Sequence, residues 1–451
     1  MGTRIAITGT WLAAALALIR FWDLTVRVEG FLVWTALFLS LYALEIVLLN
    51  SRNLLESDRS WAPVLLWIGI VFVTAVGGTV FPQVSFGDTT LQTVALFRVF
   101  DIVLPLWILL RGVFLAIPGR GALLATMGVP VYLLAVLWVL AVRMPGESYR
   151  GPLDPFSPEE VDIMRHLEKH VRTLADSIGP RGALQYQSVQ GTVEYLHGVL
   201  RDLGYSVEVS TYQVRDREHR NLQASIQGSP SSSEIVVVGA HYDTYFDTPG
   251  ADDNASGVAG VLELARLLAD FEPERTIRFV LFGTEEPPYF NTDDMGSRVY
   301  AKRVAQAGDD IVAMFSLDPI GCYADDPGTQ NNPPPLNLFY PDRGDFIAFV
   351  GNPASGSLVR RSLETFRRTT RFPSEGIVSP SMLPGIELSD HASFWRSGFR
   401  AVLVSTTGPF RNPFYHTPED TPSGVDFRRT ARVVSGLREV LIDLAGPLGG
   451  R

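Results

Sequence analysis

Residues 234–256 have the sequence EIVVVGAHYDTYFDTPGADDNAS, which joins a buried-strand pattern to a group of imidazole and carboxylate side chains. Residues 235–240 are apolar and rich in β-branched side chains, and their number is typical of a buried strand. The run ends in His241-Tyr242-Asp243, and a Pro-Gly turn then leads to Asp252-Asp253 and an apolar helical pattern. Open α/β sheets bind ligands where strands end and helices begin, and imidazole with carboxylate suits zinc. Turn chemistry with an Asx cap would also explain this stretch on its own.

Three later stretches repeat the pattern of a strand that ends in a charged side chain. A second apolar run ends in Glu285-Glu286, a third ends at Asp318, and a later loop, FYHTPEDT, supplies His416. Turn chemistry alone therefore becomes the weaker explanation, and a metal site assembled at strand ends becomes the stronger one.

In the order His-x-Asp, GADDNASG, Glu-Glu, Leu-Asp and YHTxxDT, the motifs resemble those of the co-catalytic zinc aminopeptidases, family twenty-eight of the metallopeptidases. The resemblance covers about residues 160–445. It implies the zinc exopeptidase fold, in which helices flank a mixed, largely parallel β-sheet. It also implies two Zn²⁺ per chain and these metal ligands: His241, Asp253, Glu286, Asp318 and His416.

The resemblance gives each residue of the site one role. His241 and Asp318 match the ligands of one zinc, Glu286 and His416 match those of the other, Asp253 matches the bridging carboxylate and Glu285 matches the general base. Elementary chemistry is consistent with these roles, because two metals can activate water and polarise a carbonyl while a separate carboxylate moves the proton. Neighbouring side chains at a strand end point in different directions, so Glu285 and Glu286 are not expected to bind one metal together.

Four further residues are candidates for supporting roles. Asp243 is two residues from His241 and would accept the other imidazole N–H, unless it is a simple turn acid. Asp390 and His391 lie in a Ser-Asp-His segment that resembles one near the family's active site. His391 would bind an oxyanion or substrate there, or would be a structural histidine. Tyr415 would line the pocket beside the metal ligand that follows it.

Two other features are not assigned to the site. His166 and His170 have the spacing of an HExxH zinc helix, but the glutamate is in the third position rather than the second, and the pattern is that of an amphipathic surface helix. The single cysteine, Cys322, excludes an intramolecular disulfide and is interpreted as a buried bystander. Residues 287–297 and 319–321 depart from the family pattern beside the site, which leaves the substrate preference open.

The first third of the chain differs sharply from the rest in composition. Residues 1–150 contain 10 Arg, no Lys and 8 Asp or Glu, whereas residues 151–451 contain 28 Lys or Arg and 40 Asp or Glu. No clustered basic stretch indicates nucleic-acid binding. We expect residues 1–145 to be transmembrane, in four or five spans drawn from these apolar runs: 5–19, 31–49, 61–81, 94–117 and 122–142.

The loops between these runs predict the orientation of the chain. Residues 82–93 contain no Lys or Arg, so the positive-inside rule places them outside, and two more crossings place residue 150 and onward outside as well. The prediction is a multi-pass protein of a bacterial cell membrane with an extracytoplasmic peptidase domain. Glu45 and the pair Arg98 and Asp101 lie within predicted spans, where helix packing explains them better than transport.

Residues 146–158 are predicted to be a linker and residues 159–451 the peptidase domain. In that domain strand patterns alternate with helical patterns, which indicates an α/β fold. Strands are expected at residues 206–213, 221–226, 234–240, 276–283, 311–318, 336–340, 347–351 and 400–405. Helices are expected at residues 158–178, 192–203, 256–270, 296–307, 357–368 and 426–444.

The sequence therefore predicts a membrane-anchored dizinc exopeptidase that acts on peptides, with an aminopeptidase favoured over a carboxypeptidase. One alternative is a glutaminyl cyclase-like acyltransferase that uses a single zinc. Another is a non-catalytic ectodomain used for binding. The peptide and the lipid bilayer are the expected partners, and oligomeric state is left open.

Overall fold

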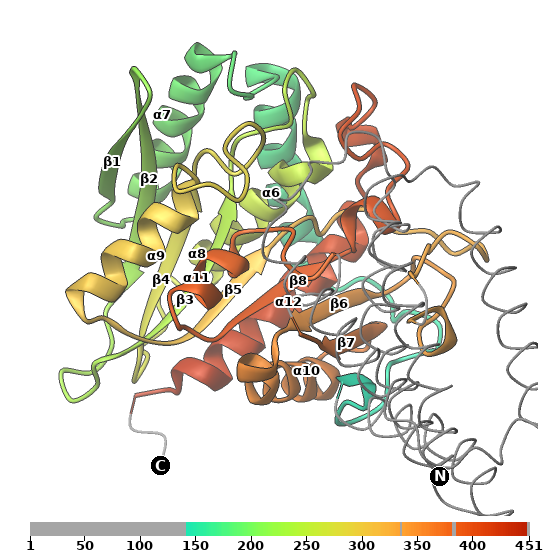
Figure 1. Ribbon diagram of the computed structural model, residues 1–451. Coiled ribbons are helices and arrows are strands. Elements are labelled where there is room, and N and C mark those ends of the chain that lie inside the picture. The colour runs from blue at the N-terminus through green and yellow to red at the C-terminus, as the bar shows by residue number, and fades with distance from the viewer. Residues whose placement is uncertain (1–140, 334–335, 381–384, 449–451) are drawn as a thin grey trace, which may run out of the picture. The chain divides into compact units, whose positions relative to one another are not determined.

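Eight strands form one mixed sheet at the centre of the residues that the computed structural model describes, which are 141–333, 336–380 and 385–448 (Figure 1). Across the sheet their order is β1-β2-β4-β3-β5-β8-β6-β7. The strands are β1 (Glu208–Val214), β2 (Arg217–Ile226), β3 (Glu234–His241), β4 (Thr276–Phe282), β5 (Asp310–Leu317), β6 (Ile347–Gly351), β7 (Ser374–Val378) and β8 (Ala401–Ser405). The central β4, β3, β5 and β8 run parallel, as do β6 and β7, whereas β1–β2, β2–β4 and β6–β8 are antiparallel pairs. This confirms the mixed α/β sheet that the sequence predicts.

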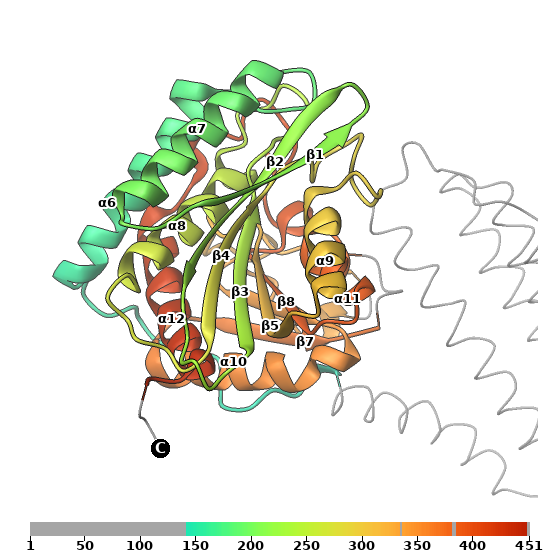
Figure 2. The same ribbon diagram turned by 90° about the vertical axis from the view of Figure 1, so that its left-hand side faces the viewer.

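Helices cover both faces of the sheet (Figure 2). α6, α7, α8, α10 and α12 pack on one face, and α9 and α11 pack on the other. The helices are α6 (Pro158–Arg172), α7 (Tyr186–Asp202), α8 (Gly257–Leu267), α9 (Gly296–Ala307), α10 (Gly356–Thr369), α11 (His391–Arg396) and α12 (Phe427–Ala445). Two π-helical turns and four 3₁₀ turns join them, at Thr173–Ile178, Ala251–Ser256, Leu336–Leu338, Pro353–Ser355, Gly408–Phe410 and Pro422–Gly424.

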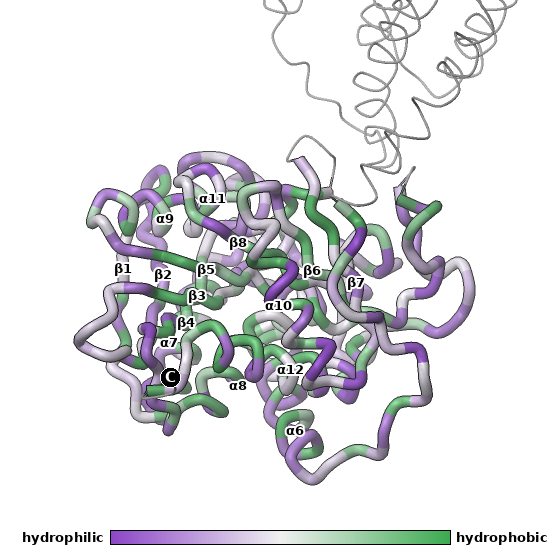
Figure 3. The backbone as a smooth tube through the Cα atoms, turned by 90° about the horizontal axis from the view of Figure 1, so that it is seen from below, coloured by the Kyte–Doolittle hydropathy of each residue, from purple (hydrophilic) through white to green (hydrophobic). Residues whose placement is uncertain are grey.

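The central strands are apolar on both faces because helices cover both. In β3, Val236 and Val238 join the core beneath α8 and α12, while Ile235 and Val237 join the core beneath α9. Parallel strands that are buried on both faces have near-continuous hydrophobic sequences, which is why this strand is evident in the sequence. Figure 3 shows hydrophobic residues along β6 and β8 as well.

The start of α6 shows how local sequence fixes a helix end. Ser157 is the N-cap residue, and its Oγ accepts a hydrogen bond from the Glu160 N–H at 3.1 Å. The Glu160 carboxylate accepts the Ser157 N–H in return, and Pro158 occupies the first helical position. This capping box stabilises the amino-terminal turn, so the helix begins where the sequence predicts.

The residues predicted to form the linker lie along the surface of the domain. Ser148 Oγ accepts the Ser374 N–H at 3.0 Å, which attaches this segment to the edge strand β7. Arg367 on α10 donates to the carbonyl oxygens of Pro145 and Gly146 at 2.9 and 3.1 Å. The segment is therefore hydrogen-bonded to β7 and α10 before α6 begins.

The predicted secondary structure differs from the structure in several places. The strand predicted at residues 336–340 is wrong: Leu336–Leu338 form a 3₁₀ turn, because Leu338 is 71% exposed and the short run pairs with no strand of the described residues. Strand β7 and helix α11 are missing from the prediction, since the sequence Ser-Glu-Gly-Ile-Val has low strand propensity and α11 is very short. Helix α7 begins at Tyr186, six residues earlier than expected.

The predicted membrane spans fall on residues 5–142, which lie outside the described residues except for the last two positions. The chain divides into two units, Met1–Val139 and Leu140–Arg451, and every described residue belongs to the second. Within the described ranges, no helix has both the length and the apolar character needed to cross a bilayer. Membrane anchoring stays a prediction.

Candidate metal centre

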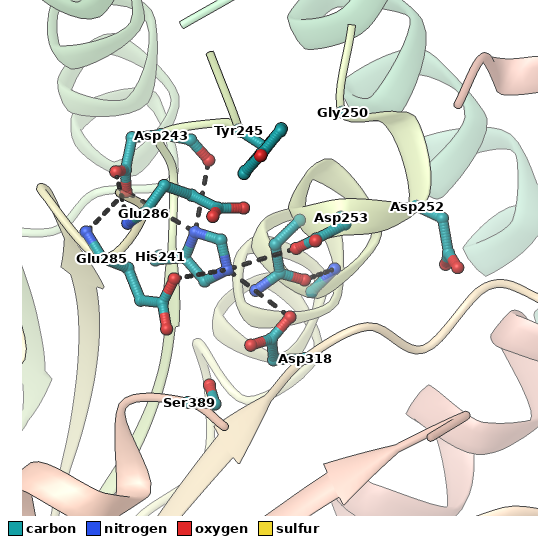
Figure 4. Close-up of polar contacts among 12 residues, drawn as sticks. His241, Asp243, Tyr245, Gly250, Asp252, Asp253, Glu285, Glu286, Asp318 and Ser389 are labelled. Carbon is teal, nitrogen blue, oxygen red and sulfur yellow. Dashed lines mark hydrogen bonds and ion pairs between the residues drawn. The ribbon is translucent and has the colours of Figure 1, made fainter. Parts of the chain in front are cut away.

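Side chains from neighbouring strands converge at one edge of the sheet (Figure 4). His241 is the last residue of β3, Asp318 directly follows β5, and Glu285-Glu286 follow β4 after two residues. Because β4, β3 and β5 are parallel neighbours, their carboxyl ends meet at this edge. Asp253 joins them from the π-helical turn before α8, and His416 joins from the loop after β8. The structure thus brings together all six residues that the sequence analysis names as metal ligands or base.

The two oxygens of Asp253 face two different histidines. His241 Nε2 is 3.4 Å from Asp253 Oδ1 and 3.4 Å from Asp318 Oδ1. His416 Nε2 is 3.1 Å from Asp253 Oδ2 and 3.2 Å from Glu286 Oε1. Asp253 therefore lies between two groups, His241 with Asp318 and His416 with Glu286, which is the position that a bridging carboxylate requires. Glu285 Oε2 lies farther from His241 Nε2, at 3.9 Å.

Five possible metal-ligand atoms of this cluster are buried and lack hydrogen-bond partners. Among the atoms without a partner are Asp253 Oδ2, Glu285 Oε1, Glu286 Oε1, Asp318 Oδ1 and His416 Nε2. A buried carboxylate is normally paired with a cation or bound to a metal, because desolvation of an unpaired charge is costly. Three overlapping sets of these side chains have ligand atoms within 4.8 Å of one another. Imidazole nitrogen and carboxylate oxygen are ligands that zinc prefers, so the residues fit zinc.

The pKa shifts within the cluster also indicate a cation site. Burial opposes protonation of His241, but Asp318 and Glu285 outweigh it and raise its pKa well above the ordinary value. Burial raises the pKa of Glu285 well above its usual range, and burial with the Asp253 charge raises the pKa of Glu286 to about 7. These shifts show that the cluster concentrates negative charge away from water, an arrangement that bound cations would stabilise.

Asp243 holds the Glu285-Glu286 pair in place. Its two carboxylate oxygens accept the backbone N–H groups of Glu285 and Glu286, at 3.0 and 2.9 Å. His241 Nδ1 lies 3.2 Å from the main-chain oxygen of Asp243 and 3.5 Å from its carboxylate. The imidazole is therefore oriented mainly by the carbonyl, while the carboxylate that was expected to orient it positions the two glutamates.

Asp420 holds the backbone at Asp253 in place, as Asp243 holds that of the two glutamates. From the sequence, Asp420 was assigned no role. Its carboxylate accepts the N–H groups of Asp252 and Asp253 at 2.9 and 3.0 Å. Asp252 points away from the cluster and accepts from Gly321 N and Asn412 Nδ2, so it is a structural acid. The last acid of the YHTPEDT motif was the signal that could have identified Asp420.

Arg181 also went unnoticed, because its contacts are all distant in sequence or made to the backbone. Its side chain is fully buried and donates to carbonyl oxygens at distances of 2.8 to 3.0 Å, those of Leu174, Gly179, Tyr242, Pro249 and Gly250. These contacts tie the residue after His241 to the turn that precedes Asp253. Arg181 thus fixes the spacing between the two metal-binding segments.

His416 lies between two tyrosine rings. The Tyr415 ring stacks on it with centroids 3.9 Å apart, and the Tyr245 ring stacks at 4.0 Å on the imidazole as well. Such stacking restricts rotation of the imidazole. Tyr415 lies beside the ligands as expected, whereas Tyr245 was not identified from the sequence.

The Ser-Asp-His segment lies at the start of α11 and is buried. His391 Nε2 is 2.7 Å from Ile386 O and donates to it, and its ring meets the Trp395 ring edge-on at 4.5 Å. These contacts favour the structural interpretation of His391. Burial raises the pKa of Asp390 to about 7, and the Asp390 charge contributes to the raised pKa of Glu285.

Comparison with known proteins gives concordant matches. The model of peptidase family M28 matches residues 221–441. The uncharacterized protein YfbL of Escherichia coli (strain K12) is 36% identical over 296 residues, which are 63% of this chain and 88% of that protein. An aminopeptidase of Pseudomonas aeruginosa (strain UCBPP-PA14) is 30% identical over 198 residues, covering 44% of this chain but only 32% of that protein. The zinc aminopeptidase BSAP from Bacillus subtilis has a similar fold, with a TM-score of 0.52 at 15% identity over 66% of this chain and 97% of that one.

Proposed function

This chain belongs to peptidase family M28, and on that premise we propose that it is a membrane-anchored dizinc exopeptidase that releases amino-terminal residues from peptides. The observation that supports the proposal most strongly is the position of Asp253, whose two oxygens face His241 and His416. In our proposal His241 and Asp318 hold one zinc, Glu286 and His416 hold the other, and Asp253 is shared. The pair of zinc ions, when bound, supplies Lewis-acid polarisation of the scissile carbonyl and a water of lowered pKa.

Glu285 is the proposed general base. It is buried beside the cluster, and Asp243 fixes its backbone. Its carboxylate takes one proton from the attacking water and passes it to the leaving amine as the C–N bond breaks, so one water is consumed for each bond hydrolysed. Asp243 and Asp420 keep the acids at the spacing that this proton transfer needs.

Within the proposed peptidase activity, the release of amino-terminal residues is the more specific claim. It is supported by the aminopeptidases among the relatives, although the match to the one from Pseudomonas aeruginosa covers only 32% of that protein. The membrane anchor and the extracytoplasmic location follow from residues 1–145 and stay predictions.

The experiment is hydrolysis of aminoacyl-anilides and dipeptides by the full-length chain. We would compare zinc-loaded protein, chelated protein and Glu285→Gln, with an amino-terminally acetylated peptide as the control substrate. We expect release of the amino-terminal residue from free but not acetylated peptides, loss on chelation, and a 10²–10⁴-fold loss in Glu285→Gln with zinc content unchanged.

Other results would contradict the proposal in distinct ways. Cleavage of the acetylated peptide at its carboxyl end would indicate a carboxypeptidase. Cyclisation of an amino-terminal glutamine without hydrolysis would indicate an acyltransferase. Zinc-loaded protein that alters no peptide would indicate a binding role.

A further inference from the structure

An apolar pocket opens beside the proposed metal centre and extends under the outer strands of the sheet. Asp318 and Tyr415 line it beside the proposed metal centre, residues of β8, β6 and β7 contribute part of its wall, and loop residues contribute the rest. Its walls are mainly aliphatic and aromatic side chains, among them Val350, Ile377, Leu403 and Phe410. With its open mouth included, the empty volume is about 850 Å³.

The strand register places four residues that line this pocket in one row across the sheet. The backbone N–H of Asp318 donates to Val404 O, which extends the pairing of β5 with β8 and brings Asp318 level with Ser405. Ser405 pairs with Ala348 on β6, and Ala348 pairs with Glu375 on β7. All four residues line the pocket, and paired residues share a face of the sheet. The row spans three strand spacings, or ~14 Å, with only the small Ser405 and Ala348 between the two carboxylates.

Contacts with Arg367 and with the segment before α6 fix the position of Glu375. Arg367 Nη2 lies 3.7 Å from Glu375 Oε2, and the same arginine donates to the carbonyl oxygens of residues Pro145 and Gly146. The preceding residue, Ser374, is bonded through its N–H to Ser148. The Glu375 side chain is 16% exposed, and it is the charged side chain farthest along the row from the metal centre. It therefore forms a fixed hydrogen-bond acceptor in a pocket whose lining is mainly apolar.

We propose that Glu375 is a specificity-determining residue, which accepts a hydrogen bond from the tip of a long substrate side chain, that of tyrosine in particular. The inference rests on the proposed function, since it requires the substrate's α-carbon to lie at the metal centre. An aliphatic side chain such as that of leucine is too short to reach across the row. A tyrosine ring matches the apolar walls, and its hydroxyl supplies the donor.

The charge around Glu375 favours a neutral donor over a cationic one. Arg367 already compensates the carboxylate, so a lysine tip would gain little attraction to set against the loss of its hydration. A phenol hydroxyl gives up less hydration and leaves the Arg367–Glu375 pair in place.

The test is a binding comparison that does not depend on turnover. Tyrosine hydroxamate and phenylalanine hydroxamate, whose hydroxamates anchor at zinc, are titrated calorimetrically into the zinc-loaded full-length chain. We expect tyrosine hydroxamate to bind about tenfold more tightly, the effect of one hydrogen bond to a charged acceptor. Glu375→Leu should bring the ratio to about one, whereas Glu375→Gln, which still accepts a hydrogen bond, should keep part of it. The matched control is Glu364→Leu, a change at an exposed position of α10 that should keep the full ratio.

The possible outcomes either overturn the inference or separate it from the proposed function. Equal binding of the two hydroxamates by the unmodified chain overturns the inference, as does a full preference that survives in Glu375→Leu. Phenylalanine hydroxamate checks that the variant is folded, because its affinity should not depend on an acceptor. If no peptide is hydrolysed but the ratio responds to Glu375, the proposed function fails and the subsite stands. If peptides are hydrolysed but the ratio does not change in Glu375→Leu, the proposed function stands and the inference about Glu375 fails.

Discussion

Two clusters of histidine and acidic side chains in this chain are alike in composition and different in charge balance. The proposed metal centre is buried at the edge of the sheet, and within the described part of the chain the basic groups beside its acids are the two imidazoles. The second cluster, formed by Asp162, His166 and Glu263 on α6 and α8, also has ligand atoms within 4.8 Å of one another. There, however, Arg266 donates to Glu263 at 2.6 and 2.8 Å and to Asp162 at 2.8 Å.

The difference shows that a cluster of ligands is not by itself a metal site. Arg266 supplies the positive charge that the second cluster needs, and Asp162 is half exposed to water besides. Among the described residues the centre at His241 has no such arginine, because the guanidinium of Arg181 behind it donates to backbone carbonyl oxygens. The uncompensated cluster is therefore the one that should take up zinc.

The largest expected effect is on metal content. Asp253→Asn removes the shared ligand, so zinc affinity should fall by more than about a hundredfold, the upper range for residues that only support a ligand. Asp162→Asn is the matched control and should bind as much zinc as the unmodified chain. Elemental analysis after dialysis against a zinc buffer gives both values, and equal zinc in the two variants would refute the comparison.

A smaller effect is expected at Asp243. In Asp243→Asn the amide oxygen can still accept one N–H, but its NH₂ group cannot accept the other, so the Glu285-Glu286 segment loses a hydrogen bond. Zinc affinity should fall about 10–100-fold. Competition with a chromophoric chelator measures it. Asp176→Asn, at an exposed position, is the control, and an unchanged affinity in Asp243→Asn would show that the carboxylate has no positioning role.

A buried histidine of α6 that lies outside both clusters predicts a pH dependence of stability. The carboxylates of Asp318 and Glu285 raise the pKa of His241, whereas burial lowers the pKa of His170 on α6 from 6.5 to about 4. His170 Nδ1 lies 2.7 Å from Tyr195 Oη. Because the folded pKa is below the unfolded one, the stability that neutral His170 contributes is fully present above pH 6.5 and is lost as the pH falls toward 4.

The measurement is urea unfolding of the metal-free chain at pH 7.5 and pH 5, with and without His170→Asn. We expect the unmodified chain to lose about 2 kcal/mol more than the variant over this range. His197→Asn, a change of the same kind on α7, is the control for effects of the substitution itself. Equal losses in the unmodified chain and His170→Asn would contradict the lowered pKa.

The smallest effect tests the comparison most directly. Arg266→Met removes the cation of the second cluster and makes its charge resemble that of the metal centre. We expect a weak additional zinc site, at least about a hundredfold weaker than the centre, because exposed ligands gain less from binding. Calorimetric titration detects it, and it should disappear in the double variant with His166→Gln. If Arg266→Met gains no zinc, charge balance is not what distinguishes the clusters.

Much of the fold was predictable because it depends on local pattern. β3 and β5 are buried on both faces, so their apolar runs are continuous, and the capping box of Ser157 marks the start of α6. Strand β7 was missed because its stability comes from pairing with β6 rather than from its own residues. The run at residues 336–340 was wrongly predicted as a strand, because its sequence is apolar but no strand of the described residues lies beside it to pair with.

The sequence by itself determined which residues stand at the ends of the central strands, and therefore which imidazoles and carboxylates could meet. Only the tertiary structure decided how they are held: Asp243 on the glutamate pair, Asp420 on the turn that carries Asp253, and Arg181 between the two. It also decided that Glu375 lies in one row with Asp318. Such contacts depend on strand order and register between segments far apart in the chain, and no local pattern records either.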